Sequence, residues 1–279
     1  MKRIKNSWQG IEGVSVFDTG QAWPSVGIVG LVHGNEPVAL KIFDLVEDKL
    51  LPQIKKWKLF FIVANLLALE QNKRLVDHNL NRIWNKPFED KSYEFRRREE
   101  LKKILDQLDV VLDIHSVSQW DNIMAIGDIK DVDTLKEIFD VPWILVNDMS
   151  KGWSLIAYMI SKGKKWFAVE VGNHNSEQGV YRWFEFVKSF LNRIGLIRAT
   201  DTRKHQYNSK VLRFLEEIYP TSENFEFAQK FETFTYLKKW EVYAYDGDKV
   251  FEAPQDVWIW LVSKKIEVGD GAGFLFVQM

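Results

Sequence analysis

The chain contains no cysteine among its 279 residues. Disulfides, thiolate metal sites and thiol nucleophiles are therefore excluded. We expect any metal in this chain to be bound by histidine, aspartate or glutamate side chains. Because there are only five histidines, the position of each one is informative.

The sequence also lacks an excess of charge and any long apolar run. Its 38 basic residues nearly balance its 39 acidic residues, which argues against a nucleic-acid partner. No apolar run approaches the ~20 residues of a membrane helix, and no apolar segment follows the basic residues of MKRIKNSWQG as it would in a signal peptide. We therefore expect a soluble, cytoplasmic protein without a membrane partner.

Short runs that are apolar throughout predict buried strands in the first two-thirds of the chain. The clearest lie at residues 26–32, 59–65, 110–115 and 167–171, with weaker candidates at 123–126 and 143–146. Amphipathic stretches predict helices at residues 36–51, 93–108 and 180–194. Strands that alternate with helices indicate an α/β sandwich around a mainly parallel sheet.

The sequence changes character near residue 199. Beyond it lie runs rich in Thr, Tyr, Phe and Val, the turn Asp246-Gly247-Asp248, and predicted strands at residues 257–262 and 274–277. We therefore expect residues 1–199 to form a catalytic domain and residues 200–279 a smaller β-rich domain.

Two histidines lie at the ends of predicted strands. His33 follows the strand at residues 26–32 and precedes Glu36 by three positions, while His115 ends the strand at residues 110–115. Ligands of open α/β sheets bind outside the carboxyl ends of the strands. A His–xx–Glu spacing alone often arises by chance, but two histidines and one glutamate are a ligand set typical of catalytic zinc.

Two carboxylates accompany these residues. Asp113 and His115 point to the same side of their strand, so Asp113 is a candidate partner of that ring. Glu170 ends the strand at residues 167–171. It could take a proton from water and pass it to a leaving nitrogen, and a purely structural glutamate is disfavoured there because unpaired burial of charge is costly.

A polar segment after the strand at residues 59–65 contains Arg74, Asn81 and Arg82. Guanidinium groups bind carboxylates through paired hydrogen bonds, although a solvated basic loop would have the same composition. His174 lies four residues beyond Glu170. It could line the same pocket or be a surface histidine.

Taken together, these segments resemble the succinylglutamate desuccinylase/aspartoacylase family, whose fold is related to that of the zinc carboxypeptidases. The resemblance spans most of residues 25–175 and rests on HGNE at 33–36, NLNRIW at 79–84, DIHS at 113–116 and EVG at 170–172. It implies a zinc carboxypeptidase-like three-layer sandwich with a mainly parallel mixed sheet, followed by a β-rich C-terminal domain.

The resemblance also implies a function. One Zn²⁺ per chain would be held by His33, Glu36 and His115, with Glu170 as the general acid and base. The reaction would be hydrolysis of the amide bond of a small acidic N-acyl amino acid.

The resemblance further implies that Arg74 polarises the scissile carbonyl, while Asn81 and Arg82 hold a substrate carboxylate. Aspartoacylases place an arginine shortly before the catalytic glutamate. In this chain the basic residues of the corresponding stretch, 160–166, are all lysines. This difference argues against N-acetylaspartate as the substrate and leaves N-succinylglutamate or another acidic acyl amino acid open. A homo-oligomeric state also stays open.

Two alternatives remain at this point. A zinc carboxypeptidase acting on peptides would use the same ligand set. A non-catalytic metal- or ligand-binding relative would keep the fold, but it would have no need of a base such as Glu170.

Overall fold

The computed structural model describes residues 7–20, 24–87, 90–117, 123–149, 152–174, 176–198, 207–261 and 271–279. The chain forms two compact units: the first comprises Met1–Ile144 and Asp148–Ser209, and the second comprises Leu145–Asn147 and Lys210–Met279. The domain boundary predicted at residue 199 stays a prediction, because residues 199–206 lie outside the described part of the chain.

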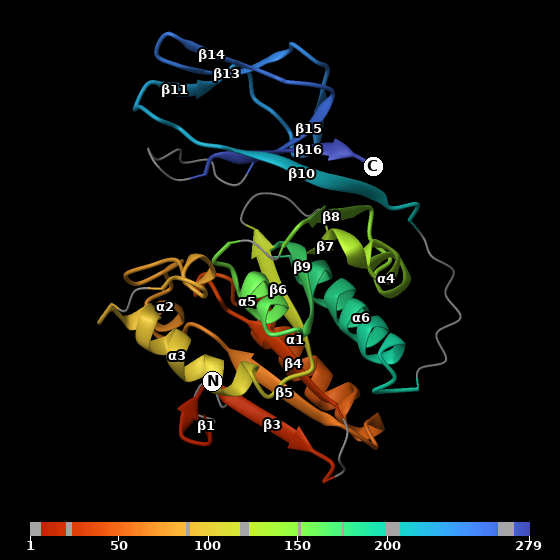
Figure 1. Cartoon of the computed structure of the whole chain (residues 1–279). Helices are drawn as coiled ribbons and strands as arrows, with labels where there is room; N and C mark the ends of the chain where they lie inside the picture. The colour runs from red at the N-terminus through yellow and green to blue at the C-terminus, as the bar shows by residue number, and fades with distance from the viewer. Residues whose placement is uncertain are drawn as a thin grey trace. The chain divides into compact units, whose positions relative to one another are not determined.

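The first unit alternates strands and helices, as the apolar runs predict (Figure 1). Its strands are β1 (Ser7–Trp8), β2 (Ile11–Glu12), β3 (Val14–Asp18), β4 (Ser25–Gly30), β5 (Lys58–Val63), β6 (Val110–Val117), β7 (Met124–Asp128) and β9 (Lys165–Asn173). Its helices are α1 (Val38–Lys49), α2 (Leu66–Glu70), α3 (Tyr93–Leu105), α4 (Val132–Ile138), α5 (Leu155–Ser161) and α6 (Glu177–Arg193). The 3₁₀ turns are η2 (Leu51–Gln53), η3 (Leu80–Arg82) and η4 (Ile129–Asp131), and β8 (Trp143–Asn147) has residues in both units.

The sheet of the first unit is mixed and mainly parallel. Its strand order includes β7-β9-β6-β4-β5-β3, in which β9, β6, β4 and β5 are parallel and both β7 and β3 are antiparallel to their neighbours. The predicted α/β fold class is therefore confirmed. The parallel register brings the carboxyl ends of β4, β6 and β9 to the same edge, where ligands of such sheets bind.

Helices pack against this sheet in layers (Figure 1). Helix α1 lies so close to β4 that a Cβ on Gly30 would come within 2.3 Å of the Ala39 Cβ. Side chains of α3 and α5 pack with side chains of β5 and β6 in one apolar cluster. This packing explains why the central strands are apolar throughout.

All three predicted helices differ in detail from the prediction, and α6 begins at Glu177, three residues before the predicted start. Helix α1 begins at Val38, so Glu36 lies in the turn that precedes the helix. Helix α3 ends at Leu105 and buries Glu94, Arg97 and Arg98 together with its apolar side chains. In the described part of the chain, we find no helix with the length and apolar character required to cross a membrane.

The second unit is made of strands. They are β10 (Lys210–Ile218), β11 (Phe225–Phe227), β12 (Thr235–Leu237), β13 (Val242–Asp246), β14 (Lys249–Glu252), β15 (Val257–Leu261) and β16 (Gly273–Gln278). The antiparallel order β12-β15-β16-β10 forms one layer and β11-β13-β14 another, with an apolar core of their own. Both predicted strands are present, although Val262 lies outside the described residues.

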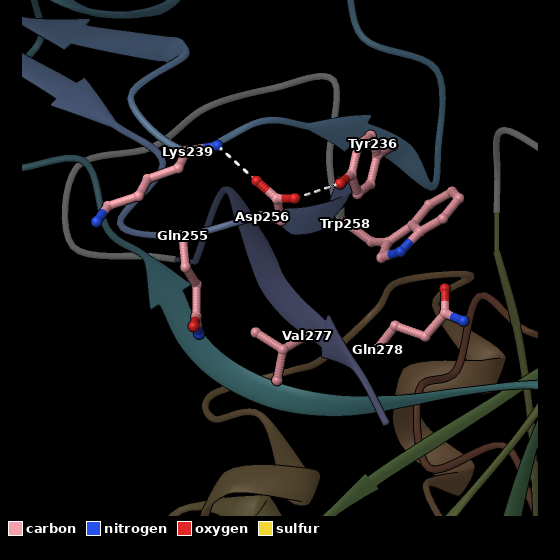
Figure 2. Close-up of a pocket in the computed structure, with 7 residues that line it drawn as sticks. All are labelled: Tyr236, Lys239, Gln255, Asp256, Trp258, Val277 and Gln278. Atoms are coloured by element: carbon pink, nitrogen blue, oxygen red, sulfur yellow. Dashed lines mark hydrogen bonds between the residues drawn. The ribbon is translucent and has the colours of Figure 1, made fainter.

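A pocket of about 500 Å³ opens in this second unit (Figure 2). Asp256 lies between Tyr236 and Lys239 in its lining and accepts hydrogen bonds from the Tyr236 hydroxyl at 2.6 Å and the Lys239 amide at 3.0 Å. The residues that line it are Tyr236, Lys239, Gln255, Asp256, Trp258, Val277 and Gln278. None of the site residues predicted from the sequence is among them.

Asp246 ends β13, and its carboxylate holds the segment before β11. It accepts hydrogen bonds from the Ser222 hydroxyl and, at 2.6 and 2.7 Å, from the hydroxyl and amide of Thr221. These hydrogen bonds, that of Ser222 first, lower the pKa of Asp246 from 3.8 to about 2. The stabilisation is therefore complete above pH 4 and is lost as the pH falls towards 2.

We expect Asp246→Asn to unfold at lower urea concentration than the wild type at pH 7, because the amide cannot accept all three hydrogen bonds. The difference should shrink between pH 4 and pH 2, as the wild-type carboxyl becomes protonated. Urea titrations across this range measure it, and Asp248→Asn in the exposed turn is the matched control. A difference that stayed constant down to pH 2 would contradict this assignment.

Candidate active site

The turn that carries His33 and Glu36 follows β4 directly. Its Glu36 amide donates to the His33 carbonyl at 3.2 Å, which turns the chain back so that both side chains face one point. Gly34 makes this turn possible, since a Cβ there would lie 2.2 Å from the carbonyl carbon of Ala68. The turn therefore packs backbone to backbone on α2, and this close approach admits only glycine.

The structure brings His33, Glu36 and His115 together. Glu36 Oε1 lies 2.7 Å from His33 Nδ1, and Glu36 Oε2 lies 3.3 Å from His115 Nδ1. The amide of Ser116 donates to the same Oε2 at 3.1 Å. All three side chains are buried, and one ligand atom from each lies within 4.8 Å of the others. The cluster can therefore hold a metal ion.

The outer nitrogen of each histidine faces a side-chain oxygen. His33 Nε2 lies 3.2 Å from Asn79 Oδ1, and His115 Nε2 lies 2.9 Å from Asp113 Oδ2. With a metal ion bound, donation by each Nε2–H would leave the Nδ1 lone pair for the ion. Both rings are thus oriented for metal binding, and the contact predicted for Asp113 is present.

The charges in this cluster depend strongly on one another. Burial and the Arg74 cation lower the pKa of His33 to about 4. Burial acts to raise the pKa of Glu36, but His33 and His115 outweigh it and hold that pKa well below its ordinary value. Burial likewise acts to lower the pKa of His115, but Asp113 and Glu36 raise it well above its ordinary value. The Glu36 carboxylate anion therefore lies between a neutral His33 and a protonated His115, and a bound metal ion would take the place of that proton.

Glu170 lies on β9 beside His115. The two residues are paired across the parallel strands β6 and β9, so their side chains emerge on the same face. Glu170 Oε2 is buried and has no hydrogen-bond partner in the described part of the chain. Burial raises the pKa of Glu170 to about 8, against the lowering effects of His115 and Arg74. A buried oxygen without a partner is costly and is typical of functional sites.

Arg74 reaches the cluster from the loop after α2. Its Nη1 atom lies 3.4 Å from Glu36 Oε1, and 46% of its side chain is exposed. The Arg74 carbonyl accepts a hydrogen bond from the Gly34 amide at 3.2 Å, which ties this loop to the turn that carries the histidine. Arg74 can therefore contact both the buried carboxylate and a ligand that enters from solvent.

The other predicted substrate residues have different surroundings. Asn81 Oδ1 accepts a hydrogen bond from the Leu155 amide at 3.0 Å, and Arg82 is exposed with its Nη1 donating to the Asn81 carbonyl. The hydrogen bond from Leu155 joins η3 to the start of α5. His174 is half-buried, and its Nδ1 lies 2.8 Å from the Ser116 hydroxyl, next to the cluster. Burial lowers the pKa of His174.

Two residues of the site were not singled out from the sequence. Asn79 orients His33, and Ser116 links Glu36 to His174. Both lie inside the NLNRIW and DIHS runs. Their positions in those runs were the only available signal, because their contacts join segments that are far apart in the sequence.

The described geometry can be compared with known proteins. The family model of the succinylglutamate desuccinylase/aspartoacylase catalytic domain matches residues 22–173, more than half of the chain. The chain belongs to this family. The matched span contains the three clustered residues as well as Arg74 and Glu170.

Curated relatives within the family match a shorter segment. A succinylglutamate desuccinylase from Shewanella sp. (strain MR-7) is 34% identical over 76 residues, which are 26% of this chain and 22% of the relative. One from Shewanella frigidimarina (strain NCIMB 400) is 32% identical over 75 residues, with the same coverage. These matches therefore span about a fifth of the relatives' length.

Solved structures match over nearly the whole chain. Succinylglutamate desuccinylase from Vibrio cholerae has a TM-score of 0.76 at 18% identity, over 95% of this chain and 85% of that one. The ectoine utilization protein EutE (DoeB) from Ruegeria pomeroyi, in its product-bound form, has a TM-score of 0.73 at 15% identity, over 95% and 88%. At such identities these likenesses establish a common fold.

Proposed function

We propose that this chain is a zinc-dependent amidohydrolase that cleaves the amide bond of an N-acyl amino acid, as a succinylglutamate desuccinylase-like or aspartoacylase-like deacylase. One observation carries the proposal: the buried cluster of His33, Glu36 and His115 lies beside Glu170, whose buried Oε2 atom has no partner in the described part of the chain. The cluster offers metal ligands, and the Oε2 atom of Glu170 offers a position for a proton in transfer.

The donor set fits one zinc ion per chain. Two imidazole nitrogens and one carboxylate oxygen are the protein ligands of many catalytic zinc sites. Imidazole and carboxylate also suit iron, cobalt and manganese, so zinc is part of the proposal. When bound, the metal supplies a Lewis acid that polarises a carbonyl and makes water more acidic.

Glu170 would move the proton in this reaction. Its Oε2 atom takes a proton as water adds to the amide carbon, and it returns that proton to the nitrogen as the carbon–nitrogen bond breaks. The products are the acyl acid and the free amine. Burial, which raises the pKa of Glu170, favours the proton-donating half of this cycle.

Positive groups would select an acidic substrate. Arg74 reaches the cluster and can polarise the scissile carbonyl, while Asn81 and Arg82 would hold a substrate carboxylate from η3. His174, joined to Ser116, would line the same site. We therefore propose a small acidic N-acyl amino acid as the substrate.

Arg74→Lys should lower kcat/KM for an acidic acyl amino acid by roughly 10- to 100-fold, because a charge-assisted hydrogen bond is worth about 1.5–3 kcal/mol and lysine lacks the planar fork. Steady-state kinetics on paired acidic and neutral substrates measure it, with Arg96→Lys on the exposed face of α3 as the control. Equal kinetics for Arg74→Lys and the control would remove Arg74 from the substrate site.

A release assay tests the proposed reaction. The chain, loaded with zinc, would be incubated with N-succinyl, N-acetyl and N-formyl amino acids and, in parallel, with peptides that have a free C-terminus. We expect free amine from an acidic N-acyl amino acid. Cleavage confined to the peptides would identify a carboxypeptidase, and metal binding without cleavage of either class would identify a non-catalytic relative.

A further inference from the structure

Glu94 is a fully buried carboxylate outside the proposed metal cluster. It lies in the first turn of α3, and none of its surface is exposed. Its Oε1 atom accepts hydrogen bonds from the Val76 amide at 2.7 Å and Asn65 Nδ2 at 3.2 Å. Its Oε2 atom accepts from the amides of Asp77 at 3.0 Å and His78 at 3.1 Å. Three consecutive backbone amides therefore converge on one side chain.

The loop in turn supplies a carboxylate that accepts a hydrogen bond from the helix. Asp77 Oδ2 accepts a hydrogen bond from the Tyr93 amide, the first of α3, at 2.8 Å. Each segment thus supplies a carboxylate that satisfies amides of the other, and these amides would otherwise lack partners at the start of a helix and in an irregular loop. The reciprocal pair fixes the loop 76–78 against α3.

This loop lies between two groups of the proposed site. Asn79 follows His78 directly, and its Oδ1 atom faces His33 Nε2 at 3.2 Å. Arg74 precedes Val76 by two residues and reaches Glu36 at 3.4 Å. The position of the backbone at residues 76–78 therefore determines where both side chains can reach.

We propose that Glu94 is a positioning residue for the metal cluster: by holding residues 76–78 it places Asn79 against His33 and Arg74 against Glu36. The inference deepens the proposed function and rests on the metal site, but not on the identity of the substrate. Glu94 itself acts through these residues and needs no contact with metal or substrate.

A neighbouring residue on the same helix provides a contrast. Arg97 is also buried, but its guanidinium donates to the carbonyls of Ala64, Val63 and Glu12 at 2.8 to 2.9 Å. It stabilises the backbone beside β5 and takes no part in the hydrogen bonds that Glu94 makes to residues 76–78. A comparison of Glu94 with Arg97 therefore allows a loss of stability to be separated from a loss of positioning.

The test compares Glu94→Gln with Arg97→Met in the full chain. Glutamine keeps the size of the side chain but replaces one acceptor oxygen with an NH₂ group that faces backbone donors. We expect zinc affinity, measured by competition with a chelator, to fall by about 10- to 100-fold, the usual effect of losing a residue that orients a metal-binding histidine. We expect Arg97→Met to lower Tm but to leave zinc affinity within about twofold of the wild type.

Two further measurements test whether Glu94 acts on the metal site through residues 76–78 and Asn79. Hydrogen exchange at the amides of residues 76–78 should accelerate in Glu94→Gln and not in Arg97→Met. The losses of zinc affinity in Glu94→Gln and Asn79→Ala should be less than additive in the double variant, because both act on His33. If Glu94→Gln does not fold, Glu94→Asp, which keeps the charge on a shorter side chain, should show the same effects in weaker form.

Unchanged zinc affinity in a folded Glu94 variant would overturn the inference. Fully additive losses with Asn79→Ala, or an equal loss in Arg97→Met, would do the same. These outcomes are independent of the proposed reaction. A chain that binds zinc with this dependence on Glu94 and yet hydrolyses no N-acyl amino acid would keep the positioning role and reject the deacylase.

Discussion

Glu170→Gln is expected to lower kcat by about 10²- to 10⁴-fold, the usual contribution of a general acid and base. The amide keeps the size of the side chain but cannot take up a proton from water. Because Glu170 is outside the proposed ligand set, zinc should stay bound at one ion per chain. Steady-state turnover and metal analysis of the same preparation measure both quantities.

The matched control is Glu177→Gln, an exposed carboxylate in the first turn of α6. It should leave kcat unchanged. Near-normal turnover in a zinc-loaded Glu170→Gln would show that another group moves the proton. Loss of zinc in that variant would instead indicate that Glu170 is a ligand.

His115→Ala is expected to abolish stoichiometric zinc binding and, with it, activity. Substitution of groups that only orient a ligand costs about 10- to 100-fold in affinity, so removal of one of three protein ligands should cost more. The substitution also leaves Asp113 buried without its partner at 2.9 Å. Glu36→Gln is therefore a second variant, with circular dichroism to establish that each protein is folded.

His78→Ala is the control for the histidine series, because its imidazole faces Asp90 at 3.0 Å on the surface and alanine keeps the backbone amide that donates to Glu94. It should bind one zinc ion per chain. Full zinc occupancy in a folded His115→Ala would remove that residue from the ligand set. Full zinc occupancy in a folded Glu36→Gln would likewise remove Glu36 from the ligand set.

Much of the first unit could be predicted because its strands are buried on both faces. Unbroken apolar runs identified β4, β5, β6 and β9, and their order along the chain implied a parallel sheet. The short helix α5 (Leu155–Ser161) and the strand β3 (Val14–Asp18) were not predicted. Their apolar residues follow no extended period, and only packing against the rest of the sheet makes these segments regular.

The site residues that could be predicted lie at the ends of regular strands, and those that could not be predicted depend on an irregular loop. His33, Glu36 and His115 could be grouped because strand ends of a parallel sheet meet at one edge. Asn79 and Glu94 could not, since their contacts depend on the path of an irregular loop. The charged face of α3 also resembled a solvated helix face, although three of its charges are buried.

We propose that one zinc ion in this cluster is required for hydrolysis. Titration of the chelator-treated chain with zinc, with bound metal and amine release from the preferred acyl amino acid followed together, measures this requirement. We expect both quantities to rise together and to saturate at one zinc ion per chain. Turnover that is already complete without added metal and resists chelators, or saturated zinc binding with no turnover, would contradict it.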